Sequence, residues 1–251
     1  MTLHRSLLAL LIGASAALAG CQNMNTDNLV QSGMLAMKAA TLSDAEIKQV
    51  ADEACAKQDA EATIAPASSA YTKRLDKIAA ALGNPLSGTS VNYKVYLTSD
   101  VNAFAMANGC VRVYSGLMDL MNDNEVEGVL GHEIGHVALG HVKKATQTAY
   151  ATAAARTAAS AAGNSAVAAL SQSQLGEIGE ALVNAQFSQS QESAADDYSF
   201  DLLKKRGIAL EGLASAFDKL AKLSGGKESS MFDSHPGCLL YTSPSPRDKR
   251  Q

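Results

Sequence analysis

The stretch Gly131-His132-Glu133-Ile134-Gly135-His136 decides the fold, and it lies inside a run, 124–144, that has the periodicity of an amphipathic helix. The apolar residues of this run recur three or four positions apart: Val126, Val129, Leu130, Ile134, Val137 and Ala138. Asn122 or Asp123 is a suitable N-cap, and Glu125 lies in the first turn, where the helix dipole favours a negative charge. We therefore predict one helix across the whole run, with the two histidines one turn apart on the same face.

Two histidines at positions i and i+4 of a helix can bind one metal ion. Glu133 lies beside the face that His132 and His136 share, close enough to reach the water molecule that such a metal activates. This His-Glu-x-x-His pattern is typical of zinc hydrolases, in which the histidines are ligands and the glutamate is the general base. The alternative is a pair of solvated or hydrogen-bonded histidines without a metal, and the sequence downstream argues against it.

A zinc hydrolase needs a third protein ligand and an open fourth position. His141 follows His132 by nine residues, which is roughly 180° around a continuous helix, so we reject it as the third ligand. The segment 187–196 also has helical periodicity and carries Glu192 and Asp196 at positions i and i+4. We predict that Glu192 binds the metal and that Asp196 orients a ligand histidine, the alternative for Asp196 being a solvated surface carboxylate.

The N-terminus has the features of an export signal. Residues 1–20 combine the basic Arg5 with an apolar core that is too short to span a bilayer. The sequence Leu18-Ala19-Gly20-Cys21 resembles a bacterial lipobox, which predicts cleavage before Cys21 and acylation of its thiol; the alternative is an ordinary secretory signal. Gln22 follows, and by resemblance to other lipoproteins this favours an outer-membrane position facing the periplasm. We expect 21–40 to be a membrane tether.

The C-terminal residues 238–251 fit no helix or strand period and resemble a translated sequencing adapter, so we exclude them as a non-native tail. This leaves 41–237, which is long enough for one domain with a sizeable core and is expected to be the zinc metallopeptidase domain. The chain has 21 Lys and Arg against 25 Asp and Glu, a net charge of −4, which argues against a nucleic-acid partner. Outside the signal, no stretch is apolar and long enough to be a transmembrane helix.

The cysteine count leaves one pair. Cys21 is assigned to the lipid and Cys238 to the tail, so Cys55 and Cys110 remain. In a chain exported to an oxidising compartment we expect these two to form a disulfide, the alternative being two free buried thiols.

The remaining pattern predicts an α+β fold, mainly helical, with a small antiparallel sheet before the histidine-bearing helix. Asn108-Gly109 between two strand-like runs is a strong signal for a β-hairpin. An exposed strand beside a zinc site could pair with an extended peptide, or the sheet could simply cover the helix. The predicted elements are helices over 41–62, 68–82 and 210–223, a helical hairpin over 145–173, and strands over 91–97, 102–107 and 110–114.

With the motif at 131–136, the acidic segment at 187–196 and the element Ser234-His235-Pro236, the chain resembles metallopeptidase family 48. This group contains membrane-linked zinc proteases of the bacterial stress-protease and prenyl-protein protease types, and the resemblance covers nearly all of 1–236. It implies a zincin-like fold of the gluzincin type, with one zinc ion on His132, His136 and Glu192, Glu133 as the base and Asp196 behind the ligands. The family often has an arginine where this chain has Gln189, so regulation could differ.

These observations together predict a lipid-anchored zinc endopeptidase that cleaves extended or misfolded envelope polypeptides. Glu133 would take a proton from water and deliver it to the leaving amine. His235 is the candidate for a second catalytic role, either as a donor to the oxyanion or as a latch on the open metal position. The competing hypothesis is a non-proteolytic assembly or chaperone-like factor that keeps zinc for structure, and an intact Glu133 counts against it.

Overall fold

The computed structural model describes most of the predicted domain, namely residues 37, 39–86, 88, 90–160, 172–224 and 235. The predicted signal peptide, Cys21, most of the predicted tether and the predicted tail lie outside these described residues. Within the described part of the chain, none of the helices combines the length and the apolar character needed to cross a membrane.

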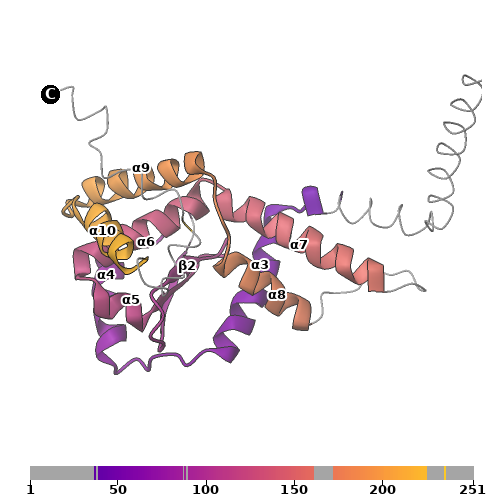
Figure 1. The fold of residues 1–251 in the computed structure, drawn as a ribbon, viewed down its shortest axis with the longest axis horizontal. Helices are drawn as coiled ribbons and strands as arrows, with labels where there is room; N and C mark the ends of the chain where they lie inside the picture. Colours follow the sequence, from indigo (N-terminus) through magenta and orange to yellow (C-terminus); the bar gives the residue numbers. More distant parts are fainter. Residues whose placement is uncertain are drawn as a thin grey trace, which may run out of the picture.

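The helices gather on the two sides of a small sheet (Figure 1): α4, α5, α6, α9 and α10 lie on one side, and α3, α7 and α8 on the other. In chain order the described elements are α3 (Asp44–Glu61), α4 (Ala70–Leu82), β1 (Asn92–Tyr96), β2 (Ala103–Ala105), β3 (Cys110–Tyr114), α5 (Ser115–Leu120), α6 (Asp123–Ala138), α7 (His141–Ser160), α8 (Gln172–Val183), α9 (Gln189–Arg206) and α10 (Gly212–Ser224).

The three strands form a mixed sheet in the order β1-β3-β2. The predicted hairpin is present, because β2 and β3 are antiparallel with Ala103 opposite Val113, and Gly109 takes the positive φ of 84° that the turn requires. The prediction of an entirely antiparallel sheet is wrong for β1, which pairs in parallel with β3. The hairpin places β3 between β1 and β2, so β3 is the central strand and β2 is an edge strand.

The two faces of β3 supply two separate cores, because successive side chains of a strand point to opposite faces. Val111 and Val113 pack in the larger core, against residues of α4, α6 and α10. Cys110 and Tyr114 face the second core, which α3 and α8 complete. A disulfide joins Cys110 to Cys55 of α3 within that second core.

A buried ion pair links the second core to the sheet. Arg112 has only 2% of its side chain exposed, and its Nε and Nη2 donate to the two carboxylate oxygens of Asp59 at 2.8 and 2.9 Å. Lys94 Nζ also donates to this carboxylate, at 2.7 Å. Burial opposes the charge on Asp59, but the hydrogen bonds from Arg112 and Lys94 outweigh it and lower the pKa of Asp59 to about 2.

The helix that carries the histidines begins as predicted and ends earlier than predicted. The side chain of Asn122 accepts from the backbone N–H of Glu125, and the Glu125 carboxylate accepts from the backbone N–H of Asn122, which is a capping box. The helix α6 then ends at Ala138, because Gly140 adopts a left-handed φ of 76° that turns the chain into α7. A single helix over 124–144 is therefore wrong, and α7 leaves in a new direction.

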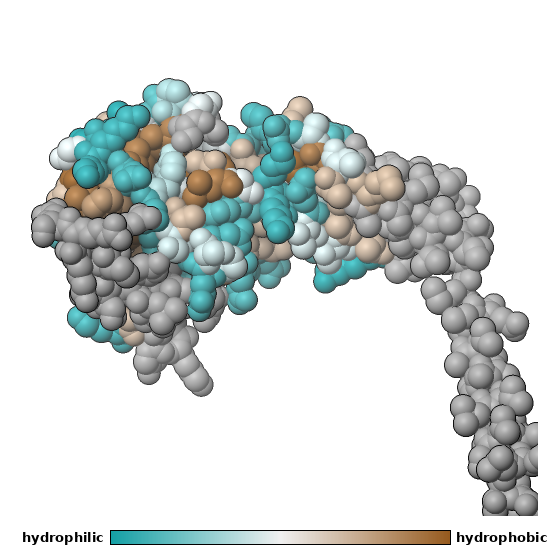
Figure 2. Space-filling model, turned by 90° about the horizontal axis from the view of Figure 1, so that it is seen from above, coloured by the Kyte–Doolittle hydropathy of each residue, from teal (hydrophilic) through white to brown (hydrophobic). Residues whose placement is uncertain are grey.

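Exposed apolar side chains are scattered on the surface. Among the described residues, four large hydrophobic side chains are exposed: Met37, Leu97, Leu139 and Phe200. Figure 2 shows hydrophobic residues as small separate patches among hydrophilic ones on the face that it presents. Single exposed apolar residues of this kind are normal and need no partner to explain them.

Candidate metal centre

The two histidines of α6 lie on one face of the helix and are fully buried. Their Nε2 atoms lie 3.1 Å apart, and both rings have at most 1% of the side chain exposed. Burial in an apolar environment lowers the pKa of His136, and the neighbouring His132 lowers it further. His136 is therefore neutral, and neutral imidazole is the form that binds a metal.

Small residues on α6 allow α9 to approach it closely. A Cβ atom on Gly131 would lie 2.5 Å from Ser199 Oγ, and one on Gly135 would lie 3.1 Å from the carbonyl oxygen of Ala195. Ser199 Oγ also donates to the carbonyl of Gly128, at 2.8 Å. These contacts bring the backbones of the two helices together and hold the first turns of α9 against the histidine face.

This approach places Glu192 of α9 beside both histidines. Its two carboxylate oxygens lie 3.4 Å from His132 Nε2 and 3.6 Å from His136 Nε2, and the residue is buried. Burial raises the pKa of Glu192, but hydrogen bonds with His132 and His235 more than offset burial and lower the pKa well below its usual range. Glu192 is therefore an anionic ligand candidate, brought from a distant part of the sequence.

His235 completes the cluster from the other end of the chain. Its Nδ1 lies 3.0 Å from Glu192 Oε1 and 3.3 Å from His132 Nε2, and its Nε2 lies 3.3 Å from Glu133 Oε1. Burial lowers the pKa of His235, but the charge of Glu133 and the hydrogen bond with Glu192 outweigh burial and raise it to about 10. Two buried carboxylates thus favour a positive charge at this point.

The donor set fits a zinc ion. One ligand atom from each of four buried residues, His132, His136, Glu192 and His235, lies within 4.8 Å of the others. Imidazole nitrogens and a carboxylate oxygen are the ligands of catalytic zinc sites. The buried Glu133 Oε1 lies 3.3 Å from His235 Nε2 but forms no hydrogen bond of suitable geometry within the described residues, which is costly unless a further group satisfies it. A divalent cation would bind the converging lone pairs and balance the negative charge of the Glu133 and Glu192 carboxylates.

Two further residues hold the histidines from behind. Asp196 Oδ1 lies 2.8 Å from His132 Nδ1; burial opposes a charge on His132, but the bonds to Asp196 and Glu192 raise its pKa. His141 Nδ1 lies 3.0 Å from His136 Nδ1, so the prediction that His141 lies on the opposite side of a continuous helix is wrong. The break at Gly140 brings His141 back against His136, although its contact is with the far side of the ring, outside the four converging residues.

Phe187 packs on the ring of His136. The two rings are stacked, with centroids 4.0 Å apart and an interplanar angle of 27°. Neither this contact nor that of His141 is predicted by the sequence pattern. Gly140 was the available signal for His141, because glycine directly after a helical run commonly ends the helix. No local pattern marks Phe187, whose role depends on how the segment before α9 packs.

The edge strand β2 lies beside the same cluster. Residues of β2 line a small cavity together with Glu133 and His235. An edge strand leaves backbone groups on one side without a partner strand, and such groups can pair with an extended peptide. Cys21, the remaining predicted site residue, lies outside the described part of the chain.

The chain is similar in sequence to known metallopeptidases. A model described as peptidase family M48 matches residues 68–239. The chain is 63% identical over 230 residues to "Metalloprotease LoiP" and 61% identical over 234 residues to "Metalloprotease YcaL", both of Escherichia coli (strain K12), with 91% of each chain covered in both comparisons. It is 28% identical over 159 residues to a "Putative beta-barrel assembly-enhancing protease" of Vibrio cholerae, covering 60% of this chain and 31% of that one.

Proposed function

The chain belongs to peptidase family M48 and is a zinc-dependent metalloendopeptidase, and from this premise we propose which residues perform the reaction. His132, His136 and Glu192 hold the zinc ion, and Glu133 is the general base. The observation that carries this assignment is the convergence of buried donor atoms from α6 and α9 within 4.8 Å, with the carboxylate of Glu133 at its edge.

The reaction is peptide-bond hydrolysis. The bound zinc supplies Lewis acidity, which lowers the pKa of a water molecule and polarises the scissile carbonyl. Glu133 accepts a proton from the water molecule while the water oxygen bonds to the carbonyl carbon. Glu133 then delivers the proton to the leaving amine as the C–N bond breaks. Asp196 accepts a hydrogen bond from His132 Nδ1 and so keeps the Nε2 lone pair of His132 directed at the ligand cluster.

His235 lies where a fourth protein ligand would be. Its contacts with Glu192 and His132 support a role as a fourth donor that substrate displaces. Its contact with Glu133 suits a second role, donation of a hydrogen bond to the oxyanion once substrate is bound. We propose the first role for the protein without substrate, because three of the four residues of the cluster already surround the His235 ring.

The substrates we propose are extended or misfolded polypeptides of the bacterial envelope, and the position we propose is the outer membrane, facing the periplasm, through a lipid on Cys21. The lipobox-like sequence before Cys21 supports the anchor. The edge strand β2 beside Glu133 supports an extended substrate, since it can add one more strand to the sheet by backbone hydrogen bonds.

The test is casein digestion by the wild-type protein and by Glu133→Gln, with zinc content measured on both. We expect the wild type to digest casein and to stop when zinc is chelated. We expect Glu133→Gln to keep about one zinc per chain and to lose hydrolysis, because it lacks the base but keeps the ligands. Full activity in a zinc-loaded Glu133→Gln protein would overturn the assignment, and zinc without any hydrolysis in the wild type would favour the assembly-factor hypothesis.

A further inference from the structure

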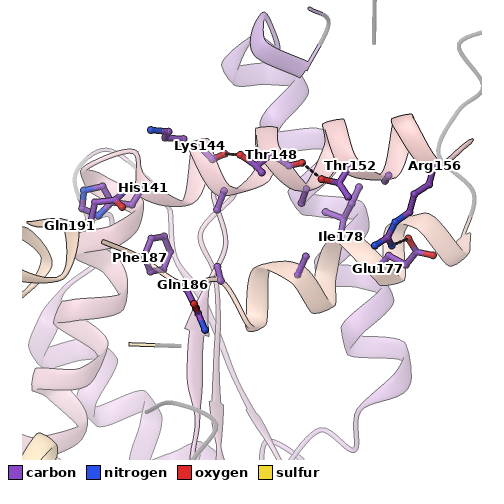
Figure 3. Close-up of a pocket in the computed structure, with 15 residues that line it drawn as sticks. His141, Lys144, Thr148, Thr152, Arg156, Glu177, Ile178, Gln186, Phe187 and Gln191 are labelled. Carbon is purple, nitrogen blue, oxygen red and sulfur yellow. Dashed lines mark hydrogen bonds and ion pairs between the residues drawn. The ribbon is translucent and has the colours of Figure 1, made fainter. Parts of the chain in front are cut away.

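A groove of about 400 Å³ runs between α7 and α8, outside the residues assigned to catalysis (Figure 3). Alanines and threonines make up nearly half of its lining. On α7 these include Ala145, Ala149 and Ala153, which are four residues apart and therefore share one face of the helix. Ala181 and Ala185 line it from α8 and the segment that follows. The short side chains are the reason that a hollow remains between two packed helices.

The inner end of this groove lies behind His136, on the side of its ring that faces away from the converging ligand atoms. His141 and Phe187 both line the groove, and both contact His136: one by a 3.0 Å hydrogen bond and the other by ring stacking at 4.0 Å. In Figure 3 they lie together at the end of the groove that points towards α6 and α9. The groove also shares Phe187 and two alanines with the small cavity beside Glu133, so a ligand in the groove reaches the catalytic cluster past this shared wall.

The lining of the groove combines apolar and polar side chains: the alanines, Ile178 and Phe187 are accompanied by Lys144, Gln186 and Gln191. The hydroxyls of Thr148 and Thr152 donate to the carbonyls of Lys144 and Thr148 on their own helix, at 3.1 and 2.9 Å, so they are already satisfied. Ile178 adds an aliphatic side chain from α8. At the outer end Arg156 pairs with Glu177 at 3.0 Å, which neutralises both charges there. Such a mixed lining suits a polypeptide segment, whose apolar side chains pack on the alanines and whose backbone groups pair with the polar side chains.

The groove also has the length of a substrate segment. From His141 to Arg156 the axis of α7 rises about 22 Å, at 1.5 Å per residue. An extended chain advances about 3.3 Å per residue, so about seven residues would span this distance. The volume lies within the range of roughly 300–1,000 Å³ that ligand pockets occupy.

We propose that the groove between α7 and α8 binds the polypeptide substrate on one side of the scissile bond, as an extended segment of about seven residues that inserts apolar side chains. The proposal rests on the proposed function and deepens it, because it assigns a substrate-binding surface remote from the catalytic residues. It predicts that the enzyme prefers unfolded chains with apolar residues at a distance from the bond it cleaves.

The test fills the groove from either wall. Ala181→Trp and Thr152→Trp each place a large ring at an exposed position that lines the groove. Ala155→Trp is the matched control, because Ala155 is exposed on the same helix as Thr152 but does not line the groove. Circular dichroism and thermal unfolding establish that all three proteins fold.

The first readout is binding, measured in the Glu133→Gln background by fluorescence anisotropy of labelled, unfolded casein. We expect Ala181→Trp and Thr152→Trp to weaken binding on the order of tenfold and Ala155→Trp to leave it within about twofold. The second readout is hydrolysis with Glu133 intact. The groove variants should raise KM for casein and leave the kcat/KM of a four-residue peptide, which is too short to reach the groove, at the wild-type value.

Unchanged casein binding and KM in both groove variants, with a wild type that hydrolyses casein, would overturn the groove proposal and leave the proposed function standing. A wild type that hydrolyses nothing would instead overturn the proposed function. If the groove variants alter only self-association or lipid-vesicle binding, the groove has another occupant and the proposal is wrong.

Discussion

Nδ1 of His141 lies 3.0 Å from Nδ1 of His136, on the side of the ring opposite the atoms that converge on the metal centre. Because Nε2 of His136 faces the other ligand candidates, Nδ1 carries the proton of the neutral ring and donates it to His141. The contact repeats for His136 what Asp196 does for His132, with a neutral partner in place of a charged one.

We expect His141→Ala to lower zinc affinity on the order of tenfold, because the ring of His136 loses the partner that fixes its orientation. Zinc stoichiometry at saturating metal should remain near one, since His141 is not among the converging residues. Competition with a chromogenic chelator measures the affinity, and His141→Asn, which keeps an acceptor, should recover part of it. An affinity equal to that of the wild type would mean that the contact is incidental.

The variant Glu192→Ala should lose most of its bound zinc, because it removes the only carboxylate within the converging set of described residues. Metal analysis after dialysis measures the loss. The control is Asp201→Ala, which removes an exposed carboxylate from the same helix and should keep the zinc content of the wild type. Retention of zinc by Glu192→Ala would exclude Glu192 as a ligand.

We expect His235→Ala to bind zinc more weakly and to digest casein faster, because it removes a fourth donor that substrate must displace. Zinc competition and initial rates with saturating metal measure the two effects. A donor to the oxyanion alone would give the opposite kinetic sign, a fall in kcat on the order of 10²-fold with little change in ground-state binding. Such a fall would refute the fourth-donor role.

The Cys55–Cys110 disulfide closes a loop with a sequence separation of 55 residues. The chain-entropy model gives about 4 kcal/mol of stabilisation for a loop of this length. We therefore expect the double variant Cys55→Ser/Cys110→Ser to show a free energy of unfolding in urea lower by up to this amount, and the wild type to show a similar loss in reductant. Mass mapping without reduction should recover the two cysteines in one linked peptide; two free thiols would contradict the pairing.

Asp59 should make the protein acid-sensitive. Its pKa is about 2 in the folded protein, against 3.8 for an unperturbed aspartate, so the folded state favours the carboxylate. The stabilisation is complete above about pH 4 and is lost as the pH falls towards 2, where the carboxylate takes up a proton. After allowance for solvent screening it amounts to about 1–2 kcal/mol.

The variant Asp59→Asn tests this dependence, because the amide cannot ionise. The difference between the wild-type and variant free energies of unfolding should shrink between pH 4 and pH 2. Urea titrations at several pH values measure it. A difference that is the same at every pH would mean that the Asp59–Arg112 pair acts through packing and hydrogen bonding alone.

Local signals predicted much of this fold. The Asn122 cap located the start of α6 within one residue, and Asn108-Gly109 located the β2–β3 hairpin, because both features depend on neighbouring residues only. The His132 and His136 spacing likewise follows from helix geometry, so a shared face could be predicted from two residues.

The remaining features depend on contacts between distant segments. The parallel pairing of β1 with β3 has no turn signal, because the hairpin intervenes between the two strands in sequence. The stacking of Phe187 on His136 depends on the path of the chain before α9. His141 was placed incorrectly because a continuous helix was assumed through Gly140, and one left-handed residue redirects everything after it.

The glycines at 131 and 135 have a consequence for ion size. At Gly131 and Gly135, α6 and α9 approach so closely that a side chain would not fit between them. These glycines therefore keep the helix that bears the histidines close to the helix that bears Glu192. Zinc binds oxygen at about 2.0–2.2 Å, whereas calcium binds at about 2.3–2.6 Å and takes more ligands. The Ser199–Gly128 hydrogen bond opposes separation of the two helices, and this resistance adds to the preference of two imidazoles and one carboxylate for zinc over calcium.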